Sequence, residues 1–194
     1  MQILTMPVGL YQTNCYMVWG EGDKCVLIDP GYQPEQLLAQ VRRQGKSVEA
    51  ILLTHGHFDH VGAVRDIAAE TDCKVYICDK ETALPEGLTA GKLYYTDGYD
   101  DGDTVEAAGL SFQVIHTPGH TPGGVCLVCE DAIFSGDTLF ASSIGRTDFP
   151  GGSYDTLKAS LQKLIALEGD YRVFPGHGED TTLSFEKRTN PYMK

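Results

Sequence analysis

Short runs of apolar residues separated by polar turns dominate the start of the chain. Residues 3–6, 16–19 and 25–28 form such runs, and a Glu-Gly-Asp segment at 21–23 separates the second from the third. Short β-prone runs bounded by turn residues predict strands, and a turn of this composition predicts a hairpin. The chain is therefore expected to begin with a small meander of strands.

Apolar residues then recur with helical spacing in two segments. The first segment begins at Pro34 and stops at Gly45, and the second covers about residues 62–70. Between them, residues 48–53 are apolar almost without interruption. Such a run predicts a strand in a sheet that is covered on both faces.

The second half of the chain mixes strands and a helix in the same way. A Gly-, Asp- and Tyr-rich segment at 85–103 precedes it and is expected to be a loop near the substrate opening. A helix capped by Ser153 or Asp155 is expected to end near Leu167. The other expected elements are a short helix at 80–84, a helical start to the tail after Ser184, and strands at 74–78, 104–107, 110–115, 125–129, 132–134 and 172–174. This order predicts an α/β fold in which two mixed β-sheets pack together with helices on the outer faces, an αββα sandwich.

The composition is that of an ordinary globular chain. The 194 residues are 42% hydrophobic and 22% charged, which is enough to bury a core in one domain covering residues 1–194. No apolar run approaches the ~18 residues that span a bilayer. The N-terminus has no basic segment of the kind found in signal peptides, so a cytoplasmic protein is expected.

The net charge narrows the choice of partners. At −12 the chain repels polyanions, so neither nucleic acid nor an anionic membrane surface is expected as a partner. A small-molecule substrate is the expectation that remains, and the oligomeric state is left open.

Six cysteines could suggest disulfides or a zinc knuckle at Cys126 and Cys129. However, these two lie three apart in a predicted strand, where side chains at that spacing face opposite sides. We therefore expect buried thiols that act as small apolar residues.

The strongest chemical signal is the segment Thr54-His55-Gly-His57-Phe-Asp59-His60. It holds four potential metal ligands within six residues, directly after a predicted strand. Clustered imidazoles and a carboxylate are costly to bury unless a cation or hydrogen-bond partners compensate them. The segment therefore predicts a metal site at the end of that strand.

Three further residues also lie just after predicted strand ends, in Gly-rich loops: His120, Asp137 and His177. Each taken alone could be an ordinary turn residue, and His116 is expected to be structural. Together with the four above, they make seven nitrogen and oxygen donors, too many for one tetrahedral zinc. They suit two divalent ions that share one carboxylate, with zinc as the first expectation and iron or manganese as alternatives.

The segment from Thr54 to His60 resembles the T-H-x-H-x-D-H signature of the metallo-β-lactamase superfamily, and His120, Asp137 and His177 follow in that family's order. The resemblance covers essentially the whole chain and implies an αβ/βα sandwich with a dinuclear site at one edge. It also implies a ligand set: His55, His57 and His120 for the first ion, Asp59, His60 and His177 for the second, and Asp137 as the bridge.

Within that superfamily the chain is similar to the short glyoxalase II-like hydrolases. The segments that carry this similarity are 116–123, 135–140 and 145–152, together with the ending at 190–192. Full-length glyoxalase II has a further C-terminal region that grips glutathione, and this chain is expected to lack it.

The resemblance implies hydrolysis of a thioester, such as S-D-lactoylglutathione, or of a related acyl ester. A bridging hydroxide would attack the carbonyl carbon, with Asp59 and Asp137 as the catalytic carboxylates. The alternative is a persulfide (sulfur) dioxygenase with a single iron, a branch that the chain also resembles through Gly145-Arg-Thr-Asp-Phe149.

Residues beside the ligands are expected to orient them. Position alone suggests Asp29, Thr54 and Ser135 for this role. Arg146 and Asp148 are expected either to shape the substrate pocket or to form an ion pair that holds a loop.

Overall fold

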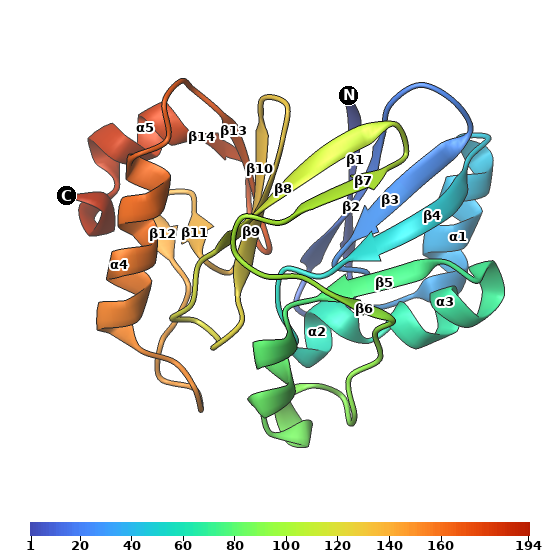
Figure 1. Ribbon diagram of the computed structural model, residues 1–194, viewed down its shortest axis with the longest axis horizontal. Coiled ribbons are helices and arrows are strands. Elements are labelled where there is room, and N and C mark those ends of the chain that lie inside the picture. The colour runs from blue at the N-terminus through green and yellow to red at the C-terminus, as the bar shows by residue number, and fades with distance from the viewer.

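Two β-sheets face each other across the middle of the molecule, and helices cover their outer faces (Figure 1). The structure is a computed structural model that describes all 194 residues. The first sheet has the order β1 (Gln2–Val8), β2 (Thr13–Trp19), β3 (Lys24–Ile28), β4 (Ser47–Leu52), β5 (Lys74–Ile77), β6 (Asp97–Gly98). The second has the order β14 (Thr181–Thr182), β13 (Arg172–Pro175), β10 (Ala132–Gly136), β9 (Val125–Cys129), β8 (Leu110–His116), β7 (Thr104–Ala107).

Both sheets are mixed, as the sequence predicted. In the first sheet, β1, β2 and β3 are antiparallel neighbours, whereas β3 through β6 run parallel. In the second, β10 and β13 are parallel and the other pairs are antiparallel. The remaining elements are α1 (Pro34–Arg43), α2 (Phe58–Val61), α3 (Val64–Thr71), α4 (Tyr154–Ile165), α5 (Leu183–Thr189), the 3-10 helices η1 (Asp79–Ala83), η2 (Glu86–Leu88) and η3 (Pro191–Met193), and a two-stranded hairpin of β11 (Leu139–Phe140) and β12 (Ser143–Ile144).

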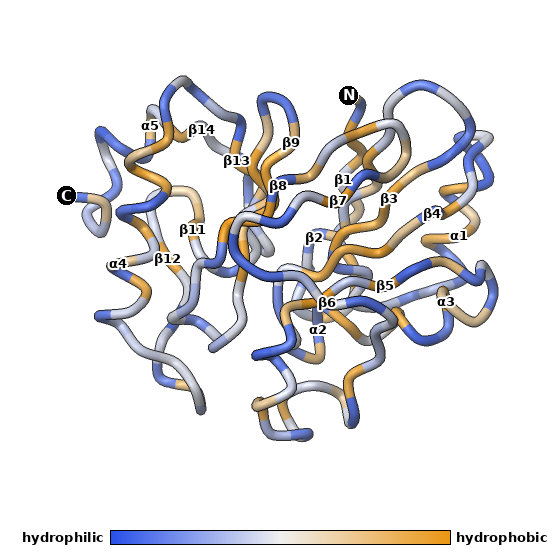
Figure 2. The backbone as a smooth tube through the Cα atoms, viewed as in Figure 1, coloured by the Kyte–Doolittle hydropathy of each residue, from blue (hydrophilic) through white to orange (hydrophobic).

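The central core lies between the two sheets. Val26 and Leu52 from the first sheet share one buried cluster with Phe112, Leu127 and Phe134 from the second. The strands that contribute to this cluster include the most apolar parts of the chain (Figure 2). Burial of apolar side chains on both inner faces holds the two sheets together.

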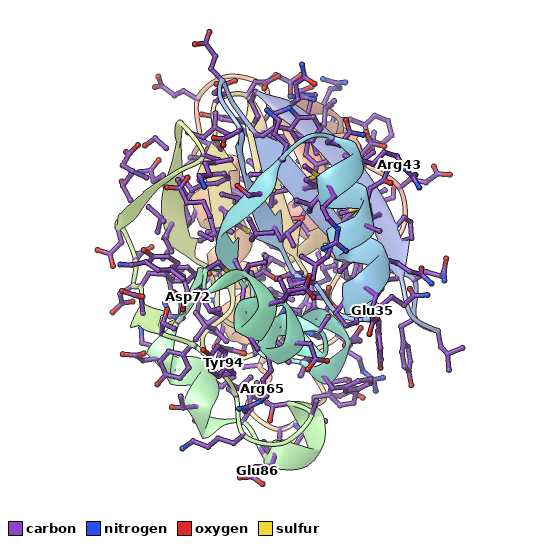
Figure 3. All side chains as sticks on the ribbon, turned by 90° about the vertical axis from the view of Figure 1, so that its right-hand side faces the viewer. Glu35, Arg43, Arg65, Asp72, Glu86 and Tyr94 are labelled. Atoms are coloured by element: carbon purple, nitrogen blue, oxygen red, sulfur yellow. The ribbon has the colours of Figure 1, made fainter.

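The outer faces are covered by amphipathic helices. Leu37 and Val41 of α1 and Ile67 of α3 pack on the first sheet, while Leu161 and Leu164 of α4 pack on the second. Figure 3 looks onto α1 and α3, whose charged side chains lie on the outer side. None of the helices has the length and apolar character to cross a bilayer.

The helix boundaries follow local chemistry. Gly45 adopts the left-handed conformation, with φ of 67°, that commonly ends a helix. Ser153, one of the two expected caps, accepts a hydrogen bond from the Thr156 amide at the start of α4. Cys126 and Cys129 are buried on opposite faces of β9, in different clusters, which confirms that they cannot share a metal.

The local structure differs from the predicted elements in three places. No helix was predicted within the metal-ligand segment, but Phe58–Val61 forms the one-turn helix α2, and the helix predicted from about residue 62 is α3, which starts at Val64. The segment 85–103 is not all loop: it contains η2 and the short strand β6, which extends the first sheet through parallel pairing with β5. The hairpin of β11 and β12 was missed, because two-residue strands carry no detectable periodicity.

Candidate metal centre

The ends of parallel strands bring the candidate ligands to one edge of the sandwich. His55 and His57 follow β4, and α2 then supplies Asp59 and His60. All four side chains are buried. Since β3, β4 and β5 run parallel, their carboxyl ends meet at this edge, where open α/β sheets place their sites.

The second sheet delivers the other three residues to the same edge. His120 lies in the loop between β8 and β9, Asp137 directly follows β10, and His177 follows β13. Because β10 and β13 are parallel, Asp137 and His177 leave the sheet side by side. The seven residues singled out from the sequence thus lie together at one edge of the two sheets.

Three histidines form a first group. A ring nitrogen from each of His55, His57 and His120 lies within 4.8 Å of the others. His57 Nδ1 and His120 Nε2 are 2.9 Å apart. A proton or a cation must lie between two nitrogens at that spacing, because two lone pairs would repel each other.

Asp59, His60 and His177 form a second group, in which one candidate ligand atom from each residue lies within 4.8 Å of the others. Asp59 Oδ2 lies 3.7 Å from His60 Nε2 and 3.3 Å from His177 Nε2. Asp137 lies between the groups: its Oδ1 is 3.4 Å from His60 Nε2, and its Oδ2 is 3.5 Å from His120 Nε2. One carboxylate therefore faces both groups.

The donor atoms fit divalent ions. His55 Nε2, His60 Nε2 and Asp137 Oδ1 are buried without a hydrogen-bond partner, which is costly unless something else compensates them. Zinc–ligand bonds of ~2.0–2.1 Å at tetrahedral angles place neighbouring ligands about 3.3 Å apart. The contacts of 3.3 to 3.7 Å between Asp59, Asp137 and the histidines are close to that spacing.

Hydrogen-bond partners orient three of the histidine rings. His60 Nδ1 donates to Asp29 Oδ2 at 2.9 Å, and His120 Nδ1 donates to the Arg146 carbonyl at 2.7 Å. Thr54 Oγ1 donates its only proton to Asp29, so it accepts from His55 Nδ1 at 3.0 Å. These contacts leave Nε2 of each ring free to face the centre.

Not every expected partner takes part. Ser135 Oγ donates to the Leu139 carbonyl and contacts no imidazole, so its expected orienting role was wrong. His177 instead donates through Nδ1 to the Tyr11 carbonyl, at 3.1 Å. A backbone partner of this kind cannot be recognised from residue type.

The pKa values of two histidines favour the neutral form. Burial, together with repulsion from His120, lowers the pKa of His57 to about 4. Burial and repulsion from His60 hold the pKa of His55 well below its ordinary value. Both rings therefore present lone pairs, and neutral imidazole is the form that binds a metal.

Two buried polar residues that support the centre were not predicted from the sequence. Thr13, on β2, donates to Asp59 Oδ2 at 3.0 Å, across 46 positions of the chain. Glu81, in η1, accepts from the amides of Gly56 and Gly123, each at 2.6 Å. Glu81 thereby ties the loop of His55 and His57 to the loop that carries His120, and nothing in the local sequence indicates this.

Replacing Glu81 by glutamine is expected to destabilise the fold. The amide nitrogen of glutamine cannot accept a hydrogen bond, so one buried N–H would lose its partner at a cost of ~1–3 kcal/mol. For a chain of this size that lowers Tm by about 2–12 °C, measurable by calorimetry. The matched control is Glu86→Gln, at an exposed position of the neighbouring η2. Equal Tm values for the two variants would contradict the role of Glu81.

A cavity of about 570 Å³ opens onto the centre. His57, Asp59, His120, Asp137 and His177 form its polar base. Its walls are Tyr11, Phe58, Leu88, Phe140, Ser143, Ile144, Arg146 and Phe149. Of the segment 85–103, which was expected near the substrate opening, only Leu88 reaches the cavity.

Arg146 and Asp148 form an ion pair at the rim. Arg146 Nε and one terminal nitrogen donate to the two carboxylate oxygens of Asp148, each at 2.7 Å. The Arg146 guanidinium also stacks 3.9 Å from the ring centre of Phe149. Arg146 lines the cavity, whereas Asp148 does not.

Comparison with known proteins agrees with this geometry. The sequence matches the metallo-β-lactamase superfamily over residues 8–177. It is 35% identical, over 100% of this chain and 98% of the relative, to a protein of Haemophilus influenzae named hydroxyacylglutathione hydrolase GloC.

Solved structures with the same fold include proteins of several names. BLEG-1 B3 metallo-β-lactamase superposes with a TM-score of 0.91 at 34% identity, covering 100% of both chains. TTHA1623 in a di-iron-bound form gives 0.87 at 42% identity, covering 97% of this chain and 99% of its own. ETHE1 from Myxococcus xanthus gives 0.86 at 29% identity, covering 98% and 84%. With its two mixed sheets, its outer helices and its edge cluster of histidines and aspartates, the chain belongs to the metallo-β-lactamase superfamily, a fold of metallo-hydrolases.

Proposed function

We propose that the chain is a thioester hydrolase with two divalent metal ions. His55, His57 and His120 would hold one ion, Asp59, His60 and His177 the other, and Asp137 would bridge them. The observation that carries this proposal is Asp137, whose carboxylate lies 3.4 Å from His60 Nε2 of one group and 3.5 Å from His120 Nε2 of the other. Zinc, iron and manganese all suit these donors. Iron stays a candidate because the similar protein TTHA1623 was solved in a di-iron-bound form.

Two bound divalent ions would supply a hydroxide nucleophile at neutral pH and polarise the thioester carbonyl. The residues of the chain then have separate tasks. Asp29 and Thr54 hold the His60 and His55 rings with Nε2 toward the centre. Thr13 donates a hydrogen bond to Asp59, which would orient the nucleophile. A thiolate is a good leaving group, so its departure requires no strong general acid.

Support for a thioester comes from the relative named hydroxyacylglutathione hydrolase. The direct test is turnover of S-D-lactoylglutathione and of simple acyl thioesters by protein of known metal content. We expect metal-dependent release of thiol from at least one of them. A chromogenic β-lactam belongs in the same panel because of the BLEG-1 likeness, and turnover of the β-lactam alone would overturn the proposal.

A persulfide dioxygenase with a single iron is the second candidate, favoured by the likeness to ETHE1. Oxygen uptake on glutathione persulfide separates the two reactions, since hydrolysis consumes no oxygen. One iron per chain with substrate-dependent oxygen uptake would favour the dioxygenase. Two ions per chain with thiol release would favour the hydrolase.

A cytoplasmic location and the absence of nucleic-acid and membrane partners stay predictions.

A further inference from the structure

We propose that the preferred thioester carries uncharged, apolar groups beside the reacting carbonyl, rather than the charged groups of a glutathione conjugate. This inference rests on the proposed thioester hydrolysis and concerns the substrate of that same site. It follows from the walls of the 570 Å³ cavity.

Aromatic side chains stand directly beside both groups of candidate ligands. The Phe149 ring centre lies 5.6 Å from that of His57, and the Phe140 ring centre lies 6.2 Å from that of His177. Groups next to a carbonyl that reaches the centre would therefore come close to one of these rings. Aromatic surfaces of this kind favour apolar groups, because both lose water on contact.

The remaining walls continue the apolar lining. Tyr11 and Phe58 form an edge-to-face pair, with ring centres 5.4 Å apart, on a further side of the cavity. Leu88 and Ile144 complete the apolar set. These side chains come from separate segments of the chain, so the lining does not reflect one hydrophobic stretch.

The only cation on the walls is already paired. Arg146 is the sole Lys or Arg among the lining residues, and its bidentate contact with Asp148 neutralises its charge. Its guanidinium carbon also lies over the Phe149 ring, 3.9 Å from the ring centre. A carboxylate of glutathione would have to compete with Asp148 for this guanidinium, in a chain whose net charge of −12 already repels anions.

The test is a series of thioesters of one neutral thiol, N-acetylcysteamine, with acetyl, butyryl and hexanoyl groups, beside S-D-lactoylglutathione. Each methylene that becomes buried should raise kcat/KM by about fourfold until the cavity is filled. S-D-lactoylglutathione should have a lower kcat/KM than the hexanoyl thioester. A flat series, or S-D-lactoylglutathione as the best substrate, would overturn the inference while leaving thioester hydrolysis intact.

Two variants check that the cavity wall is responsible. Phe140→Ala should flatten the chain-length dependence, whereas Phe185→Ala, at an exposed position of α5, should leave it steep. Arg146→Met should leave the ratio of kcat/KM for S-D-lactoylglutathione to that for the hexanoyl thioester unchanged. A selective loss with the glutathione thioester would identify Arg146 as an anion-binding residue and overturn the inference. If metal-loaded protein turned over none of these thioesters, the proposed function would fail, and the inference with it.

Discussion

Replacing Asp137 by asparagine is expected to lower kcat/KM for a thioester by about 10³-fold or more, because several kcal/mol of transition-state stabilisation by bound ions would be lost. Asparagine keeps the shape of the side chain but removes the charge, and it offers only one oxygen. Asp137 Oδ2 lies 3.5 Å from His120 Nε2 of one group and 3.7 Å from His177 Nε2 of the other, and an uncharged amide at this position would hold two cations much less strongly. Metal content, measured by mass spectrometry, should fall below two ions per chain in the same variant.

The matched control is Asp66→Asn. Asp66 is exposed on α3 and makes no side-chain hydrogen bond, so its loss should change neither kcat/KM nor metal content. If Asp137→Asn kept both its two ions and the activity of the unaltered protein, the bridging role would be wrong. If it kept its ions but lost activity, Asp137 would act on the reacting groups rather than as a bridge.

Removal of the metal ions is expected to lower Tm by about 10–20 °C. An ion present at 100 times its Kd stabilises the native state by ~2.7 kcal/mol, so two ions contribute roughly 5 kcal/mol, and each kcal/mol shifts Tm by about 2–4 °C for a chain of this size. The physical reason lies in the buried donors, because His55 Nε2 and His60 Nε2 have no other partner. Calorimetry before and after treatment with a chelator gives the shift.

Adding back different ions provides the control. Zinc should restore the Tm, whereas magnesium, which prefers oxygen ligands and keeps its water, should not. The same Tm for loaded and stripped protein would show that the cluster is stable without ions, and this would contradict the proposed two-ion centre.

Much of the fold could be predicted from local patterns. The apolar run before Thr54 predicted a strand that is covered on both faces, and β4 is such a strand. Helical spacing predicted α1 and α4, because each has enough turns to show a periodicity. The single turn of α2 could not be predicted, since one turn carries no repeat and is not stable on its own.

The sequence by itself determined the chemistry of the centre. Four of the seven candidate ligands lie within six residues, so the position of one short segment is enough to bring them together. The other three were found because each follows a predicted strand, and strand ends that run parallel meet at one edge. Residue type and position therefore sufficed to propose which side chains gather.

Only the tertiary structure decided how those side chains are held and what surrounds them. The ring orientations depend on partners such as the carbonyls of Tyr11 and Arg146, which any residue type could supply. Glu81 contributes by joining two loops that lie far apart in the chain. The apolar cavity combines segments that no local pattern connects. Hydrogen-bond geometry and cavity shape arise from contacts distant in sequence, whereas the identity of a metal donor is a property of the residue itself.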